Sequence, residues 1–159
     1  MDSYFSRHRD VELSTIYYVD TEIAANWTAI TVVKSWPNFN KVTLPVICVR
    51  LLNVDSERKE VGSRTLKEEY LITVDIFAKS DGQRLDLATF LTDTLSDNWT
   101  HYNHSQTSGT PETLTRTANG KVLWRSFSEN SKIDFSETVE VYDRFRHSIT
   151  LTVAVETTL

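Results

Sequence analysis

The stretch Glu68–Asp97, EEYLITVDIFAKSDGQRLDLATFLTDTLSD, decides the fold of this chain. Over Glu68–Phe77 the side chains alternate with a period of two, which predicts a β-strand. At Ser80 the period changes, because Ser80 and Gln83 have the spacing of a capping box and the apolar residues that follow recur at helical intervals. The stretch therefore predicts a strand, a turn and then a helix that ends near Asp97.

The segment before this stretch predicts the other half of a long hairpin. Pro45–Asn53 is apolar on both faces, as expected for a central strand covered on two sides. The single cysteine, Cys48, lies in this run, and we expect a buried structural thiol. The mixed-charge stretch Asp55–Thr65 separates the two predicted strands, which gives an extended hairpin with a charged tip. Ala29–Lys34 predicts a further short strand.

The N-terminal part predicts one helix behind a flexible arm. Residues 1–9 show no periodicity, and we expect them to be mobile or to order on a partner. Val11–Trp27 places apolar residues at i, i+3 and i+4, the pattern of an amphipathic helix, and Asp10 is its expected N-cap.

The remainder predicts a loop, a second hairpin and a closing strand. Residues 99–111 are polar and have no period, which predicts a surface loop. Asn119-Gly120 tolerates the positive φ angles of a type I′ turn, so the segments on either side, residues 112–118 and 121–128, predict a β-hairpin. Arg144–Glu156 alternates and predicts a long strand with one solvent-exposed face, after a short strand at Val139–Tyr142.

These elements predict a single α+β domain over residues 1–159. The expected architecture is a mainly antiparallel sheet flanked by helices on one side. In this interpretation residues 99–128 are a loop plus a hairpin.

The composition narrows the classes of function. The net charge of −5 argues against a protein that binds nucleic acid by neutralising phosphates. No apolar run approaches the roughly 18–20 residues that span a bilayer, and the N-terminus lacks the apolar core of a signal peptide. We therefore expect an intracellular protein that contacts no membrane.

Few residues suggest chemistry. His101 and His104 could ligate a metal, but two histidines without a cysteine or acidic residue nearby are poor material for a zinc site, and exposed loop histidines are the simpler interpretation. Asp75 could act as a general base, although a buried or paired structural acid is favoured. We expect that the chain is not an enzyme and that it binds no cofactor or metal. A small enzyme that uses Asp75, His101 and His104 is kept as an alternative hypothesis.

The charged stretch Asp55–Thr65 is a candidate contact surface. It is either a solvated hairpin tip or an arm that docks on a neighbouring subunit, because charges of both signs suit self-complementary contacts. The candidate contact residues are Glu57, Arg58, Lys59, Glu60 and Arg64 in this stretch, with Trp99, His101 and His104 in the predicted loop.

The chain resembles the tail terminator (tail completion) and related neck proteins of long-tailed bacteriophages. The resemblance covers residues 10–97, and Phe145–Val155 fits the family's closing strand. It rests on the N-terminal amphipathic helix, the charged hairpin and four stretches: ITVVKSWPNF at Ile30–Phe39, PVICVR at Pro45–Arg50, YLITVDIF at Tyr70–Phe77 and KSDGQRLDL at Lys79–Leu87.

This resemblance implies a structural virion protein. Such subunits assemble in the host cytoplasm into a ring, commonly a hexamer, at the neck of the virion. The ring ends the tail tube and meets the head-side connector or stopper protein, and DNA passes through it without specific binding. The family has no catalytic residue or cofactor to carry over. The insertion 99–128 departs from simpler members and leaves open whether the chain is a terminator or another neck component.

A second hypothesis comes from a different class. The same α+β scaffold could serve as a non-catalytic intracellular adaptor or binding module that acts as a monomer or dimer. The oligomeric state separates the two hypotheses, because only the first requires a ring.

Overall fold

The computed structural model describes residues 3–34, 43–62, 66–107, 113–133 and 145–157 of the chain. The fold is α+β, as the sequence predicts. In chain order the elements are β1 (Ser3–Tyr4), α1 (Arg7–Asn26), β2 (Thr31–Val33), β3 (Val46–Arg58), β4 (Leu66–Ala78), α2 (Asp81–Leu95), β5 (Trp99–Thr107), β6 (Thr113–Ile133) and β7 (Phe145–Glu156).

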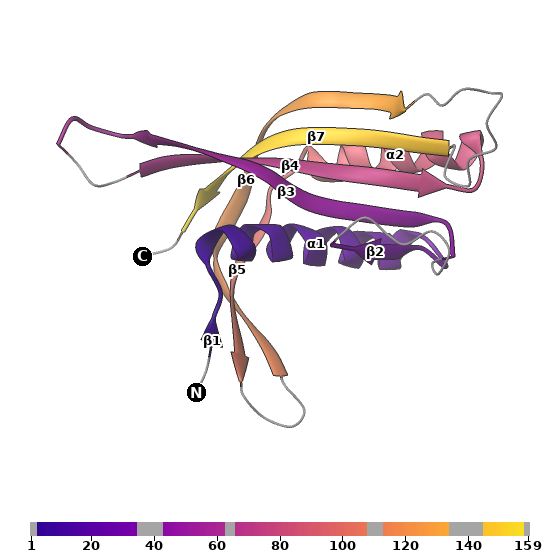
Figure 1. Cartoon of the computed structure of the whole chain (residues 1–159). Helices are drawn as coiled ribbons and strands as arrows, with labels where there is room; N and C mark the ends of the chain where they lie inside the picture. The colour runs from indigo at the N-terminus through magenta and orange to yellow at the C-terminus, as the bar shows by residue number, and fades with distance from the viewer. Residues whose placement is uncertain (1–2, 35–42, 63–65, 108–112, 134–144, 158–159) are drawn as a thin grey trace.

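The strands of the described residues form one curled sheet in the order β1-β5-β6-β7-β4-β3-β2 (Figure 1). Neighbouring strands are antiparallel except β2 and β3, which are parallel. α1 contacts β2, β3 and β5, and α2 contacts β4 and β7. Residues of both helices belong to the same core cluster, so the helices pack on one face of the sheet.

The strand–turn–helix predicted at Glu68–Asp97 is confirmed as β4 followed by α2. Ser80 is the N-cap, and its hydroxyl accepts the Gln83 backbone N–H at 3.2 Å. The Gln83 side chain in turn accepts the Lys79 N–H at 2.9 Å, so two backbone donors at the start of the helix are satisfied. Leu87, Leu91 and Leu95 are fully buried at intervals of four, as the helical period requires.

The long hairpin before that helix is confirmed as well. β3 pairs with β4 from Val46 opposite Phe77 to Arg58 opposite Leu66. Val46–Val49 is buried at every position, so both faces are covered there, as predicted. Over residues 53–62 and 66–68 the hairpin extends away from the body of the sheet, with Val54 still packed against the core, and we call this part the charged arm. Figure 1 shows it extending to the left beyond the other elements.

The prediction of a flexible arm over residues 1–9 is wrong for residues 3–9. Ser3–Tyr4 pairs with β5, and α1 begins at Arg7 with Ser6 as its N-cap. Asp10, the predicted N-cap, lies inside the helix and is buried. Pairing with a strand about 100 residues away leaves no local period in these residues, which is why the pattern failed here.

The predicted surface loop at 99–111 is also wrong for residues 99–107, because Trp99–Thr107 is strand β5, and residues 108–111 lie outside the described residues. β5 pairs with the first part of β6, and the two strands project downward in Figure 1. We call β5 together with Thr113–Gly120 the braced hairpin, because side chains of α1 bond to its backbone.

The predicted turn at Asn119-Gly120 is wrong too, since both residues lie within strand β6, which continues on either side of them. These two residues lie opposite the single residue His101, which makes a β-bulge. Gly120 has φ +90°, and a Cβ there would lie 1.8 Å from the Glu156 carbonyl oxygen. The dipeptide does supply a positive φ, but the chain uses it to bend a strand where β6 leaves β7.

β7 is confirmed as the closing strand, yet it has no exposed face along most of its length. Arg146, Ser148 and Thr150, on the predicted wet face, are buried. β7 is central, between β6 and β4, and the Thr73 hydroxyl on β4 lies 3.5 Å from those of Ser148 and Thr150. The short strand predicted at Val139–Tyr142 lies outside the described residues.

Candidate functional site

The charged arm carries the accessible part of the predicted contact surface. The side chains of Glu57, Arg58, Lys59 and Glu60 are exposed, and Val61 at the tip is fully exposed. Arg64 lies outside the described residues. A two-stranded ribbon of this kind has no core of its own, so its free energy of formation depends on the body or on a partner.

The base of the charged arm is anchored to the start of α1 through Glu68. The Arg7 guanidinium donates to Glu68 at 2.6 Å, and the Tyr70 hydroxyl donates to the other carboxylate oxygen at 2.6 Å. Burial, followed by this hydrogen bond to Glu68, raises the pKa of Tyr70. The direction of the arm relative to the body is therefore set by contacts at its base, and its tip is left exposed.

The other three predicted contact residues do not lie on the surface. Trp99 is buried and stacks on Tyr18 of α1 with ring centroids 5.2 Å apart. His101 and His104 are 2% and 1% exposed, so they are not the exposed loop histidines that the sequence suggested. Their side chains offer no contact surface to a partner.

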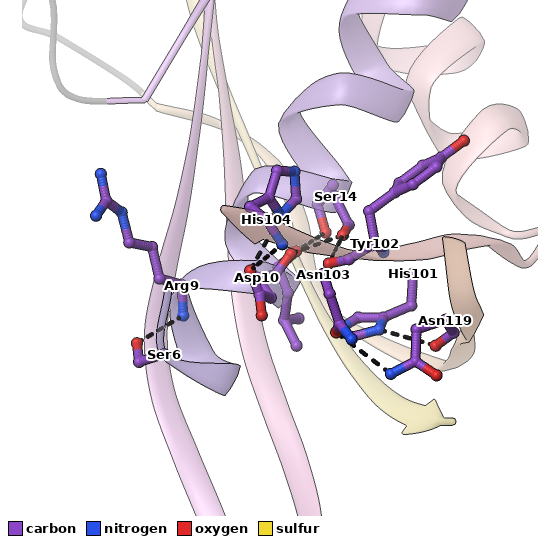
Figure 2. Close-up of polar contacts among 11 residues, drawn as sticks. Ser6, Arg9, Asp10, Ser14, His101, Tyr102, Asn103, His104 and Asn119 are labelled. Carbon is purple, nitrogen blue, oxygen red and sulfur yellow. Dashed lines mark hydrogen bonds and ion pairs between the residues drawn. The ribbon is translucent and has the colours of Figure 1, made fainter. Parts of the chain in front are cut away.

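His104 and Asp10 form the centre of a buried polar network (Figure 2). One Asp10 carboxylate oxygen accepts both the backbone N–H and the Nδ1–H of His104, each at 3.0 Å. One helical turn on, the Ser14 hydroxyl accepts the Tyr102 backbone N–H at 2.9 Å. Two side chains of α1 therefore take the place of a neighbouring strand along β5.

The second histidine ties β5 to β6. His101 Nδ1 lies 3.0 Å from the Asn119 carbonyl oxygen, which requires a proton on Nδ1 (Figure 2). Burial lowers the pKa of His104, although the neighbouring Asp10 carboxylate acts in the opposite direction. Each ring thus uses Nδ1 as a donor and its buried Nε2 has no hydrogen-bond partner among the described residues. This arrangement holds strands together and presents no nitrogen to solvent.

The three residues considered for catalysis, Asp75, His101 and His104, do not lie together in the structure. Asp75 is buried on β4 with Arg50 3.5 Å away, and two strands, β7 and β6, separate it from the histidines on β5. Within the described ranges no group of three or more His, Cys, Asp or Glu residues could hold a metal ion. A cavity of ≈ 500 Å³ is lined by the network itself, through Asp10, His101 and His104, and by the surrounding Phe5, Arg7, Asn103, Thr117, Asn119 and Thr157.

Cys48 is a free, buried thiol, as predicted. Burial raises its pKa to about 11, and the nearby Arg50 guanidinium only partly opposes this shift. Such a thiol stays protonated at neutral pH and is a poor nucleophile.

A second polar network, buried at Arg84 and His147, connects α2 with the last part of β6. Arg84 donates to His147 Nδ1 at 2.8 Å, and His147 Nε2 lies 2.6 Å from the Asn130 side-chain oxygen. Asn130 also donates to the Thr92 hydroxyl at 2.9 Å. Burial, with the Arg84 charge as the next cause, lowers the pKa of His147. These contacts hold β6 in place around Asn130, although the side chains there are exposed.

The comparisons with known proteins add no family. No protein-family model matches the chain, and no curated protein matches it. Neither helix in the part of the chain that the structure describes is long and apolar enough to cross a membrane.

Proposed function

We propose that this chain is a structural subunit of a ring at the head–tail junction of a long-tailed bacteriophage, where the ring ends the tail tube and joins the head-side connector. The proposal starts from the sequence resemblance. The observation that carries it is the charged arm, a β-ribbon that projects from a well-packed body and has exposed charges of both signs.

A projecting ribbon of this kind suits a protein that works by assembly. Residues 55–62 of the arm are exposed in the isolated chain, so a contact with a neighbouring subunit there adds burial without disturbing the core. The neighbour can be a copy of the same chain, because basic side chains of one copy can then contact acidic side chains of the other. The buried histidine network fits this view as a brace for the second hairpin.

The net acidic charge is compatible with DNA that passes without binding. A surface of negative charge repels phosphates and lowers the affinity for DNA at any sequence. A ring whose lumen proved basic would contradict this part of the proposal.

The test is assembly of the purified full-length chain, alone and with a tail-tube protein. Sedimentation velocity and negative-stain electron microscopy should show a closed ring, in solution or on the end of tubes. A chain that stays monomeric or dimeric under both conditions would refute the proposal and favour the adaptor hypothesis. A ring on tube ends that does not stop further tube growth would point to another neck component.

A further inference from the structure

We propose that neighbouring subunits join by continuing the sheet: Val54–Arg58 in the charged arm of one copy pairs antiparallel with Glu129–Ile133 of β6 in the next copy. This inference rests on the proposed ring and names the contact that builds it. The occupant of each strand edge is a second copy of this chain.

The outer edges of β3 and β5 are covered only in part. α1 covers β5 through Asp10 and Ser14, and it covers β3 at Leu51, whose N–H donates to Glu12 at 2.9 Å. β2 pairs with β3 only at Val46–Cys48. Within the described ranges, no strand pairs with the outer edge of β3 beyond these points, and an uncovered edge is a template for another strand.

In the part of the chain that the structure describes, the outer side of β6 has no strand partner beyond Val122. β5 pairs with β6 only as far as Val122, whereas β7 pairs with its other side up to Ile133. β-Bulges interrupt the ladder to β7 between Trp124 and Glu129, and such bulges discourage pairing. The five residues Glu129–Ile133 are regular, and the Asn130 contacts with His147 and Thr92 hold them in place.

The two regular edges match in charge and polarity. Lys132 already lies 3.7 Å from the Asp81 carboxylate within its own chain, at an exposed position. When Lys132 is placed opposite Asp55 in an antiparallel ladder, Glu129 falls opposite Arg58, which adds two pairs of opposite charge. Such directly opposed pairs stabilise a sheet, whereas like charges destabilise it. The full register pairs Ile133 with Val54, Lys132 with Asp55, Ser131 with Ser56, Asn130 with Glu57 and Glu129 with Arg58.

The strand directions agree with this register. Three antiparallel steps separate β6 from β3, so the two strands run in opposite directions within one subunit. If the sheet of one copy continues into the next in the same orientation, β6 meets the neighbouring β3 antiparallel. Because the contact joins two different surfaces, it is head-to-tail and can close a ring.

The register also fixes an offset between neighbours. Within one subunit Glu129 is level with Arg50, through Thr150 and Thr73. In the proposed contact it faces Arg58, eight residues farther along (58 − 50 = 8), or about 26 Å at ~3.3 Å per residue. Such a stagger requires strands inclined to the ring axis, as in closed barrels.

Disulfide trapping tests the contact directly. The full-length double variant Ser56→Cys/Ser131→Cys should give, on mild oxidation of the assembled ring, a ladder of covalent multimers that ends at the copy number of the ring. Each single variant should give none, and Ser56→Cys with Ser126→Cys, on the same strand but outside the register, is the matched control. Cys48 is buried and should not interfere.

Charge exchange provides a second test. Asp55→Lys or Lys132→Glu alone should raise the protein concentration at half-assembly about tenfold, because like charges then face each other. The double exchange should return it to within about threefold of the original. Asp20→Lys and Lys79→Glu reverse exposed charges away from the contact and should change nothing.

The outcomes separate this contact from the ring proposal. Rings that form normally but give no cross-link from the 56/131 pair, and no rescue by charge exchange, would overturn the contact and leave the ring intact. Dimers cross-linked by Ser56→Cys alone would mean that two arms pair with each other, which also overturns it. Failure of the unaltered chain to form any ring with the tail-tube protein present would refute both proposals.

Discussion

Two hairpins project from the same sheet, and they differ in what supports them. The braced hairpin is held by α1: Asp10 and Ser14 bond to its backbone, the Tyr17 and Tyr102 rings meet edge to face at 5.5 Å, and the Arg116 guanidinium lies 4.4 Å from the centre of the Tyr17 ring. Among its described residues, the charged arm is anchored at its base, through the Glu68 contacts and the packing of Val54 against the core.

This difference separates stability from assembly. Changes in the braced hairpin remove buried partners and should lower the free energy of unfolding of the single chain. Changes in the charged arm touch exposed side chains and should act on contacts between copies, with little effect on folding. The following predictions test that separation.

The largest expected effect is the loss of Asp10. Asp10→Ala leaves the Nδ1–H and backbone N–H of His104 buried without an acceptor, which should lower the free energy of unfolding by about 3–5 kcal/mol in urea denaturation. Asp20→Ala, an exposed aspartate on the same helix, is the control and should cost far less. Equal losses for both variants would show that the network does not brace the hairpin.

Gly120→Ala should follow. The new Cβ would meet the Glu156 carbonyl oxygen, and φ +90° is strained for alanine, so we expect a loss of about 2–4 kcal/mol. Gly62 in the charged arm is a matched control, because its φ of +85° is similar but nothing lies within 4 Å of an added Cβ. Thermal melts of both variants should show a clearly larger loss for Gly120→Ala.

Acidification should weaken the fold through the buried histidines. His104 and His147 have folded pKa values lowered by burial, so below about pH 6.5 the unfolded chain binds more protons than the folded one. Their contribution to stability is complete above that pH and is lost as the pH falls. Urea denaturation at pH 8, 7, 6 and 5 should show this decline, and His147→Asn should reduce its slope. An unchanged slope would remove His147 from this account.

Arg116→Ala should have a small effect. It removes a cation–π contact with Tyr17 at the surface, worth about 0.5–1 kcal/mol. Lys121→Ala, on the same strand and also exposed, is the control. Chemical denaturation of the pair would resolve the difference, and a larger loss for Lys121→Ala would contradict the role given to Tyr17.

The smallest effect on folding should come from the charged arm. Glu57→Ala and Arg58→Ala should change the free energy of unfolding by no more than about 0.5 kcal/mol, since both side chains are exposed. Sedimentation velocity on the same samples should nevertheless show weaker assembly for Arg58→Ala. A variant that unfolds easily would mean that the arm contributes to the core after all.

The hairpin that the sequence predicted correctly is the one whose strands carry their own apolar pattern. β3 and β4 continue from a buried body into the arm, so their period of two and their apolar runs are visible locally. β5 has no such pattern, since His101, Tyr102 and His104 are packed by partners on α1 and β6 that lie far away in the chain. In the sequence, β5 shows only polar residues without a period, and such a pattern predicts a loop rather than a strand.

The candidate contact residues also fall into a group whose exposure the sequence predicted correctly and a group for which it did not. The exposure of Glu57, Arg58, Lys59 and Glu60 follows from a charged stretch between two apolar strands, and the sequence alone suffices to predict it. Trp99, His101 and His104 were misplaced because their burial depends on α1 lying across β5, which no local pattern shows. The edge at Glu129–Ile133 was not predicted for a related reason, because it depends on which strands pair with β6 in three dimensions, and no described strand pairs with its outer side there.

Sequence alone determined the elements whose partners are neighbours in the chain: the capped helix α2, the β3–β4 hairpin and the apolar core strands, where spacing and capping act over a few residues. The conformation and the contacts of the polar segments depended on the tertiary structure alone. Asp10 became a buried acceptor, Asn119-Gly120 became a bulge, and the N-terminal residues became an edge strand, because a buried backbone N–H must find an acceptor wherever the fold provides one.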